Sequence, residues 1–322
     1  MKSGLKAIAG IFAAATIGTA FAPAASAQVL AIGTTKGGAT NTVATTIAKV
    51  ISTKTKYQMR TQTMGGTQQY IPMVNAGETP FGVSNMPQYW MAKTGTGLSE
   101  GTKYENLRLL ANLMQFRVGP TVPAKSDIRK LSDIKGKRVP FGFKASPLFG
   151  LIMEAWLANA GLTPDDVEKI PAVGLPQSWQ IFKEGKVDMV ISAVGTGAVK
   201  EMDASIDGGV RYISLNTEPE AVKALLKYFP RSYISEVKPE KGLTGLTEPQ
   251  KILFYDYMVW GSKDVDDEAM YTAAKAIYEN ADELKAASPI WRPFDVKKMA
   301  KDQGTEYHPG AMKFYKEVGL VK

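Results

Sequence analysis

The chain has 322 residues, a formal net charge of +8, no Cys and a single His. The absence of Cys excludes thiol nucleophiles, disulfides and zinc sites built on Cys, and a Ser-His-Asp triad would have to use His308. The basic residues are scattered, with no basic block interleaved with aromatic residues, so we expect no nucleic-acid binding. We also expect no catalytic residues, no cofactor and no metal site, although the sequence leaves open whether Na⁺ or Ca²⁺ assists binding.

Residues 1–27 have the pattern of a secretory signal peptide. Lys2 and Lys6 form a basic start, an apolar run covers residues 7–22, and small residues surround the end at Ala27. No later stretch approaches about 18 uninterrupted apolar residues, the length needed to span a membrane. We therefore expect cleavage after Ala27 and a soluble protein in the periplasm.

The next 60 residues predict alternating strands and helices. The spacing of apolar residues indicates a strand at 30–33, a Gly/Thr loop at 33–40 and a helix at about 40–52. The pattern continues with a strand at 57–63, a Gly/Thr turn at 63–69, a short helix, and a strand at 81–85. Repeated β-α units favour a mainly parallel sheet, with ligands beyond the carboxyl ends of the strands.

The same layout follows a second time, which predicts two α/β lobes. A strand is expected at 107–118 and another at 138–143, before a helix at 148–160. The C-terminal third is more helical. There we expect, in chain order, a helix at 218–228, a strand at 252–259, and helices at 264–281 and 309–320.

The loop at residues 33–40 nearly matches a nucleotide phosphate loop. Ala39 stands where that motif requires Lys, and Lys36 is in the wrong place to replace it. An NTPase is therefore not expected. Main-chain N–H groups at a helix start still suit other anions.

Several fragments in order resemble the TAXI family of extracytoplasmic solute receptors, which serve TRAP transporters. The fragments are "IGTTKGGAT-NTVATTIAKVI", "TMGGTQQYIPMVNAGETPFGVSN", "LSDIKGKRVPFGFKASP", "WQIFKEGKVDMVISAVGTG" and "YHPGAMKFYKEVGL". The resemblance runs over about residues 30–320, behind the predicted signal peptide.

The resemblance implies a two-lobed type II periplasmic binding protein, in which each lobe has a mainly parallel sheet flanked by helices. One lobe would hold residues 28–118 and about 231–322, the other 119–230, with the ligand in the cleft between them. Ligands of the family are often small carboxylates, glutamate and 2-oxoglutarate among them. The family loop often carries Tyr where this chain has Asn41 and Thr42, so the chain lacks that aromatic wall and its solute could differ.

The predicted ligand-binding residues lie at strand ends and helix starts. Turn and capping roles are the alternative for most of them, a structural ion pair is the alternative for Arg117, and solvated surface for Lys144. We expect His308 to cap the last helix, and Trp156, Trp179 and Trp260 to lie in the core. The predicted contacts are Thr34, Thr35, Thr40, Asn41, Gly65, Gly66, Thr67, Ser84, Asn85, Arg117, Ser146, Gly174, Leu175, Val194, Gly195 and Thr196.

Taken with the resemblance, these residues predict a monomeric receptor that captures a small organic anion. The candidates are a dicarboxylate, a 2-oxo acid or an acidic amino acid, delivered to the permease subunits of a TRAP transporter. Two alternatives stay open: a ligand-sensing protein for a membrane receptor or signalling partner, and an enzyme on the same scaffold. The second would need a nucleophile or an acid-base pair in the cleft, and the sequence shows neither.

Overall fold

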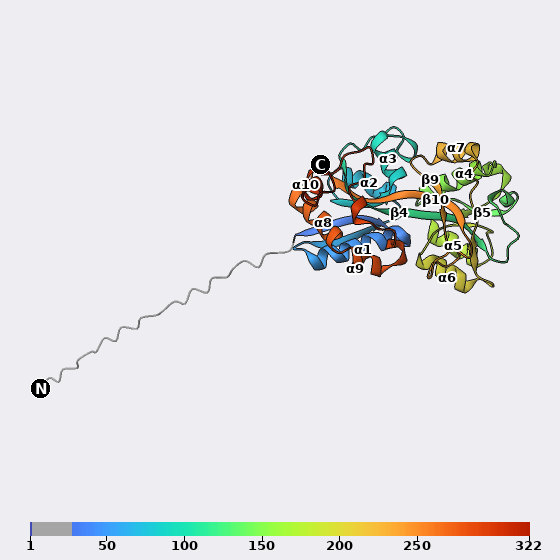
Figure 1. Ribbon diagram of the computed structural model, residues 1–322, viewed down its shortest axis with the longest axis horizontal. Coiled ribbons are helices and arrows are strands. Elements are labelled where there is room, and N and C mark those ends of the chain that lie inside the picture. Colours follow the sequence, from blue (N-terminus) through green and yellow to red (C-terminus); the bar gives the residue numbers. More distant parts are fainter. Residues whose placement is uncertain (2–27) are drawn as a thin grey trace.

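The computed structural model describes residue 1 and residues 28–322, and the predicted signal peptide lies outside this range apart from Met1. Figure 1 shows two lobes side by side, joined by the long strands β4 (Leu107–Pro123) and β10 (Gln250–Ser262). No helix in the part of the chain that the structure describes is long and apolar enough to cross a membrane.

The first lobe is built on three parallel strands in the order β2-β1-β3. They are β1 (Val29–Thr35), β2 (Gln58–Met64) and β3 (Phe81–Asn85). The helices α1 (Gly38–Lys54), α2 (Thr67–Asn75) and α3 (Met86–Thr94) each follow one of these strands. The predicted apolar face of α1 is buried, with Val43, Ile47, Val50 and Ile51 in the core.

Strands β4 and β10 run antiparallel and extend beyond the first lobe. At one end β10 pairs with β3, where Tyr257 is opposite Asn85, and at the other end with β9 (Tyr233–Val237). The far part of β4 pairs with β7 (Val190–Ala193) and β8 (Val210–Tyr212). One mixed sheet therefore passes through both lobes, parallel in β2-β1-β3 and antiparallel around the long strands.

The second lobe also contains a separate parallel pair, β5 (Arg138–Gly142) and β6 (Glu168–Ala172). Its helices are α4 (Leu148–Asn159), α5 (Leu175–Lys183), α6 (Gly197–Ser205) and α7 (Pro219–Tyr228). Short 3₁₀ turns span Gly97–Ser99, Leu131–Ile134, Pro164–Asp166, Pro289–Trp291 and Val296–Lys298.

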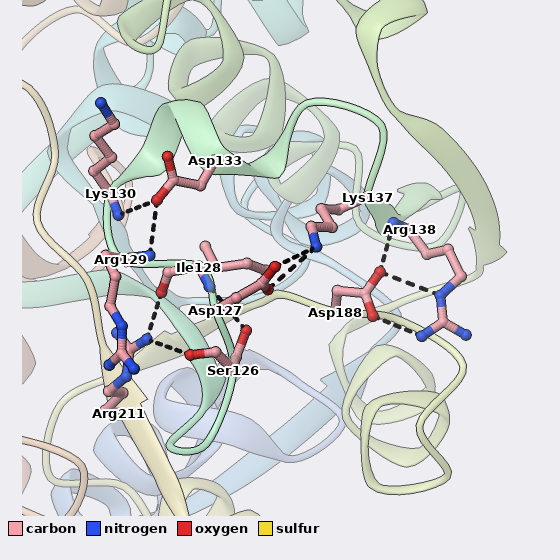
Figure 2. Close-up of polar contacts among 10 residues, drawn as sticks. All are labelled: Ser126, Asp127, Ile128, Arg129, Lys130, Asp133, Lys137, Arg138, Asp188 and Arg211. Atoms are coloured by element: carbon pink, nitrogen blue, oxygen red, sulfur yellow. Dashed lines mark hydrogen bonds and ion pairs between the residues drawn. The ribbon is translucent and has the colours of Figure 1, made fainter.

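A network of polar contacts links the segment after β4, β5, β8 and the turn before β7 (Figure 2). The Arg211 guanidinium in β8 donates to the carbonyl oxygens of Ser126 and Ile128 in the segment after β4. Arg138 holds both oxygens of Asp188, at 2.6 and 3.2 Å. Burial raises the pKa of the Asp188 carboxyl, but the hydrogen bonds and charge of Arg138 outweigh it, so the pKa lies below its usual range. This network ties β5 to the turn before β7.

The C-terminal helices return to the first lobe. They are α8 (Asp267–Glu279), α9 (Ala281–Ala287) and α10 (Pro309–Glu317). As predicted, His308 caps α10, because its Nδ1 accepts a hydrogen bond from the Gly310 N–H at 3.2 Å. The buried Tyr315 hydroxyl of α10 donates to the Leu110 carbonyl of β4 at 2.6 Å, which attaches this helix to the central sheet.

Most predicted elements are present, and the expected strand at 252–259 is confirmed within β10. Four helices and strands had no prediction: α3, α6, α9 and β9. The strand expected at 107–118 continues to Pro123, because its far part finds new partners in β7 and β8. Trp156 and Trp260 are fully buried, as expected for core residues.

Candidate functional site

A cavity of about 80 Å³ lies between the two lobes, room for on the order of five to eight water molecules. Its walls come from the β1–α1 loop, the starts of five further helices, and the central strands. The lining residues are Thr35, Lys36, Gly37, Gly38, Ala39, Thr40, Gly65, Asn85, Phe116, Val118, Ser146, Leu148, Phe149, Gly174, Leu175, Pro176, Trp179, Ile191, Ser192, Ala193, Thr196, Tyr255 and Tyr257.

The β1–α1 loop forms one polar wall. Gly37 and Gly38 have φ of 71° and 72°, a left-handed conformation that glycine adopts without strain. The loop is held by its own side chains, since Asn41 Nδ2 donates to the Thr35 carbonyl at 3.1 Å and Thr35 Oγ1 donates to the Gly37 carbonyl at 3.1 Å. The first turn of α1 is thereby aimed at the cavity.

Six helices, α1 to α6, begin at this cavity. Asn85 caps α3 by accepting from the Gln88 N–H at 2.9 Å. Over residues 28–322, no side-chain cap is made to the starts of the other five. The first N–H groups of a helix have no partner within the helix, and the helix dipole places partial positive charge there. The cavity is therefore an electropositive site built from main-chain groups.

Aromatic side chains from the central strands form another wall. The ring of Phe116 in β4 stacks on Tyr255 and Tyr257 of β10, with centroids 5.5 and 4.8 Å apart. The Tyr257 hydroxyl donates to Thr40 Oγ1 at 2.6 Å, and this bond joins the wall to the start of α1. Burial raises the pKa of both tyrosines, so both phenols stay protonated and neutral at ordinary pH.

Two hydroxyls in the lining make no hydrogen bond to another described residue. The Ser146 side chain precedes α4 in the second lobe, the Tyr255 side chain lies on β10, and the two residues are only 6% and 3% exposed. Neither hydroxyl is among the fully enclosed side-chain atoms without a partner, so both remain accessible from the cavity. Both groups line the cavity, so a polar ligand there would satisfy them.

The second lobe supplies the remaining apolar wall. Trp179 of α5 lines the cavity and is half-buried, so the prediction that it lies in the core is wrong. Its indole Nε1 donates to the Ile191 carbonyl at 2.9 Å, which leaves the carbon surface of the ring for the cavity. Leu148, Phe149 and Leu175 extend this surface.

Half of the sixteen predicted contact residues line the cavity. They come from both lobes, as the two-lobed arrangement requires. They are Thr35, Thr40, Gly65, Asn85, Ser146, Gly174, Leu175 and Thr196.

Four of the other predicted residues, all in the first lobe, do not line the cavity. Thr34 is fully buried and alternates with Thr35, so the two face opposite sides of β1. Ser84 accepts from the Trp260 indole at 2.9 Å, and Thr67 is paired with the Tyr70 hydroxyl at 3.2 Å. The Asn41 side-chain amide donates to the Thr35 carbonyl within the β1–α1 loop.

The last four predicted residues lie outside the lining for other reasons. Gly66 packs against the backbone at Ala145, outside the cavity lining. Arg117 alternates with Phe116 and Val118 and lies in a separate crevice beside Glu236 and Glu240. Burial lowers the pKa of its guanidinium. Val194 belongs to the apolar core of the second lobe, and Gly195 forms a turn with φ of 83°.

Sequence reasoning missed the aromatic residues of β4 and β10. The β1–α1 loop contributes no aromatic residue to the lining, as expected, but Phe116, Tyr255 and Tyr257 supply an aromatic wall from the sheet. Strand alternation showed which residues share a face but gave no sign that this face lines a cavity. Among the described residues, no group of three or more His, Cys, Asp or Glu side chains could hold a metal ion.

Comparison with solved structures defines the class of the fold. A protein described as a periplasmic transporter shares 13% identity, covers 92% of this chain and 94% of its own, and has a TM-score of 0.56. The binding protein of an ABC phosphonate transporter from Pseudomonas aeruginosa shares 12% identity, with 92% and 86% covered and a TM-score of 0.55. PhnD1 from Prochlorococcus marinus, in complex with methylphosphonate, shares 12%, with 92% and 100% covered and a TM-score of 0.54. The fold is that of the two-lobed, type II periplasmic binding proteins.

The chain belongs to the NMT1-like family, whose model matches residues 31–319. The assignment to the TAXI family is therefore wrong. The TRAP permease that the resemblance implied loses its basis with it, and the transporter system named for the Pseudomonas structure is of the ABC type.

Proposed function

We propose that the protein is a periplasmic receptor that binds a small organic anion in the cavity between its lobes and presents it to a membrane transporter. The observation that carries this proposal is the convergence of five helix starts without side-chain caps on one cavity. Each free N–H group can donate to an anion, and a hydrogen bond to a charged group contributes about 1.5–3 kcal/mol. A few such bonds, less the cost of ordering, support micromolar binding, near about −8 kcal/mol.

The comparisons agree with this ligand class. Two proteins of the same fold are named for phosphonates, and methylphosphonate is a small anion. A carboxylate has the same need for converging donors, so carboxylates, sulfonates and phosphonates all belong in the first screen. The neighbours named as transporter components favour delivery to a membrane transporter over sensing or catalysis.

The lobe arrangement gives the binding a mechanism. In this proposal one lobe comprises residues 28–118 with about 231–322, the other comprises 119–230, and the receptor acts as a monomer. The ligand contacts both lobes at once only in the closed form. It therefore binds that form more tightly and stabilises it. A shift from 1:99 to 99:1 closed requires about 5.5 kcal/mol of differential affinity.

A thermal-shift screen followed by calorimetry tests the proposal. We expect at least one small organic anion to raise the melting temperature and to bind with one site per chain. Ser146→Ala should weaken binding of that ligand roughly tenfold, because it removes a hydroxyl that lines the cavity and makes no hydrogen bond to another described residue. Ser205→Ala is the matched control, since Ser205 is exposed and bonds only to the Glu201 carbonyl within α6. A panel of carboxylates, sulfonates and phosphonates that leaves both readouts unchanged would overturn the proposal.

A further inference from the structure

The charge of the cavity lining is one-sided. Of the residues that line it, all within the described range, Lys36 alone is charged, and no Asp or Glu is among them. Lys36 is exposed and makes no ion pair with any residue that the structure describes. The five helix starts without side-chain caps add partial positive charge to the same space.

This arrangement opposes an ammonium group in the ligand. A buried ammonium needs a carboxylate or several acceptor oxygens, because taking the charge out of water is costly. The side-chain oxygens in the lining, including the hydroxyls of Ser146 and Tyr255, are all neutral, and several of them are already paired. Thr40 is paired with Tyr257, Ser192 with Thr121, and the Asn85 carbonyl with Gln88.

The aromatic walls of the cavity favour an apolar group in the ligand. The stacked rings of Phe116, Tyr255 and Tyr257 face the cavity from the sheet, and Trp179 and Phe149 from the second lobe. The Trp179 N–H and the Tyr257 hydroxyl are already hydrogen-bonded. A second charged group on the ligand would therefore meet mainly apolar surface, where an unpaired charge is strongly disfavoured.

From these features we infer that the ligand is a compact organic anion with one charged end, a branched or aromatic apolar body, and no ammonium group. A branched 2-oxo acid fits this description. The corresponding amino acid and the longer dicarboxylates do not. The inference rests on the proposed function and narrows the ligand class of the same cavity.

Ligands that differ in one charged group test this inference independently of the proposed receptor function. 3-Methyl-2-oxobutanoate and L-valine share one carbon skeleton and differ in the oxo and ammonium groups, and 2-oxoglutarate adds a second carboxylate. By calorimetry we expect the branched oxo acid to bind at least about a hundredfold more tightly than L-valine, because a like charge in a site costs several powers of ten in affinity. It should also bind more tightly than 2-oxoglutarate.

A variant at the start of α6 tests the charge argument directly. Thr196 lines the cavity and is the residue before α6, a position where Asp and Asn are both favoured. Thr196→Asp adds the missing carboxylate and should reduce the preference for the oxo acid over L-valine by about tenfold or more. Thr196→Asn has nearly the same shape without the charge, and should keep the wild-type preference.

Each result decides between the two claims. Equal or tighter binding of L-valine, or tighter binding of 2-oxoglutarate, overturns the inference and leaves the anion receptor in place. If other organic anions bind but the branched 2-oxo acid does not, the inference is likewise overturned and the anion receptor stays in place. An unchanged preference in Thr196→Asp contradicts the charge argument. If no organic anion binds, the proposed function and the inference fall together.

Discussion

Gly66 and Ala145 meet across the junction of the two lobes. A Cβ atom on residue 66 would lie 2.5 Å from the Ala145 carbonyl oxygen and 3.1 Å from the Cα of Ser146. The backbone at Gly66 is extended, with φ of −164°, so its conformation does not itself require glycine. The close approach does, because a Cβ atom at 2.5 Å from backbone oxygen forces one side to move.

The first prediction is that Gly66→Ala impairs closing more than folding. The added methyl group must separate the lobes at this point, and overpacking of this kind costs about 1–3 kcal/mol. Affinity for the ligand should fall about tenfold to a hundredfold by calorimetry, while the melting temperature without ligand changes little. Gly150→Ala is the control, because a Cβ there has open space inside α4. Equal affinity for Gly66→Ala and the wild type would show that the lobes do not need this contact.

A second prediction concerns the bond that joins the aromatic wall to the start of α1. Tyr257→Phe and Thr40→Val each remove one partner of the 2.6 Å contact between the two hydroxyls. We expect each change to lower the free energy of unfolding by about 1 kcal/mol, and the double variant to lose less than the sum. Denaturant unfolding of the four proteins in this cycle measures the coupling. Strictly additive losses would mean that the bond contributes nothing.

Tyr255 and Tyr257 of β10 illustrate which features of the site could be predicted from the sequence and which could not. Apolar spacing and the β-branched and aromatic residues of 252–259 were enough to predict a strand, which is confirmed. Residues on both faces of β10 are buried, so the pattern does not distinguish a face that lines a cavity from one that packs on helices. The cavity role of Tyr255 and Tyr257 depends on Phe116, 139 to 141 positions earlier in the sequence, and on the opposing lobe.

Residues at strand ends were easier to place than residues within strands. Thr35, Thr40, Gly65 and Thr196 could be predicted because small polar residues followed apolar runs at positions where a parallel sheet opens toward a ligand. The position of Arg117 within a strand gave no reason to exclude it from the predicted contacts. A shift of one residue in a strand moves a side chain to the other face, and only the register of β4 shows that Phe116 and Val118 line the cavity.

A third prediction follows from the only histidine. His308 Nδ1 accepts from Gly310 N–H, so Nε2 must carry the hydrogen that it donates to the Lys263 carbonyl at 3.2 Å. Burial lowers the pKa of the His308 imidazole, although the bond to Lys263 and the charge of Asp267 oppose it. The unfolded chain, with a pKa of about 6.5, therefore takes up the proton first as the pH falls.

The folded state favours the neutral form of His308. The stability that comes from this preference is fully present above about pH 6.5 and is lost as the pH falls through the lower pKa of the folded state. We expect the free energy of unfolding to fall between about pH 7 and pH 5 in the wild type. His308→Asn keeps an acceptor at the start of α10 and removes the titration, so its decline should be shallower. Denaturant midpoints at the two pH values measure both slopes, and equal slopes would contradict this assignment.

The fourth prediction tests where the ligand binds, which is the central claim. Trp179 is the one tryptophan among the residues that line the cavity, so its fluorescence reports on that space. On titration with an anion that calorimetry shows to bind, we predict a saturable change in tryptophan emission with the same dissociation constant. In Trp179→Phe the emission change should disappear while calorimetry still detects binding. An emission change that persists in Trp179→Phe, or calorimetric binding by the wild type with no emission change, would contradict a binding site between the lobes.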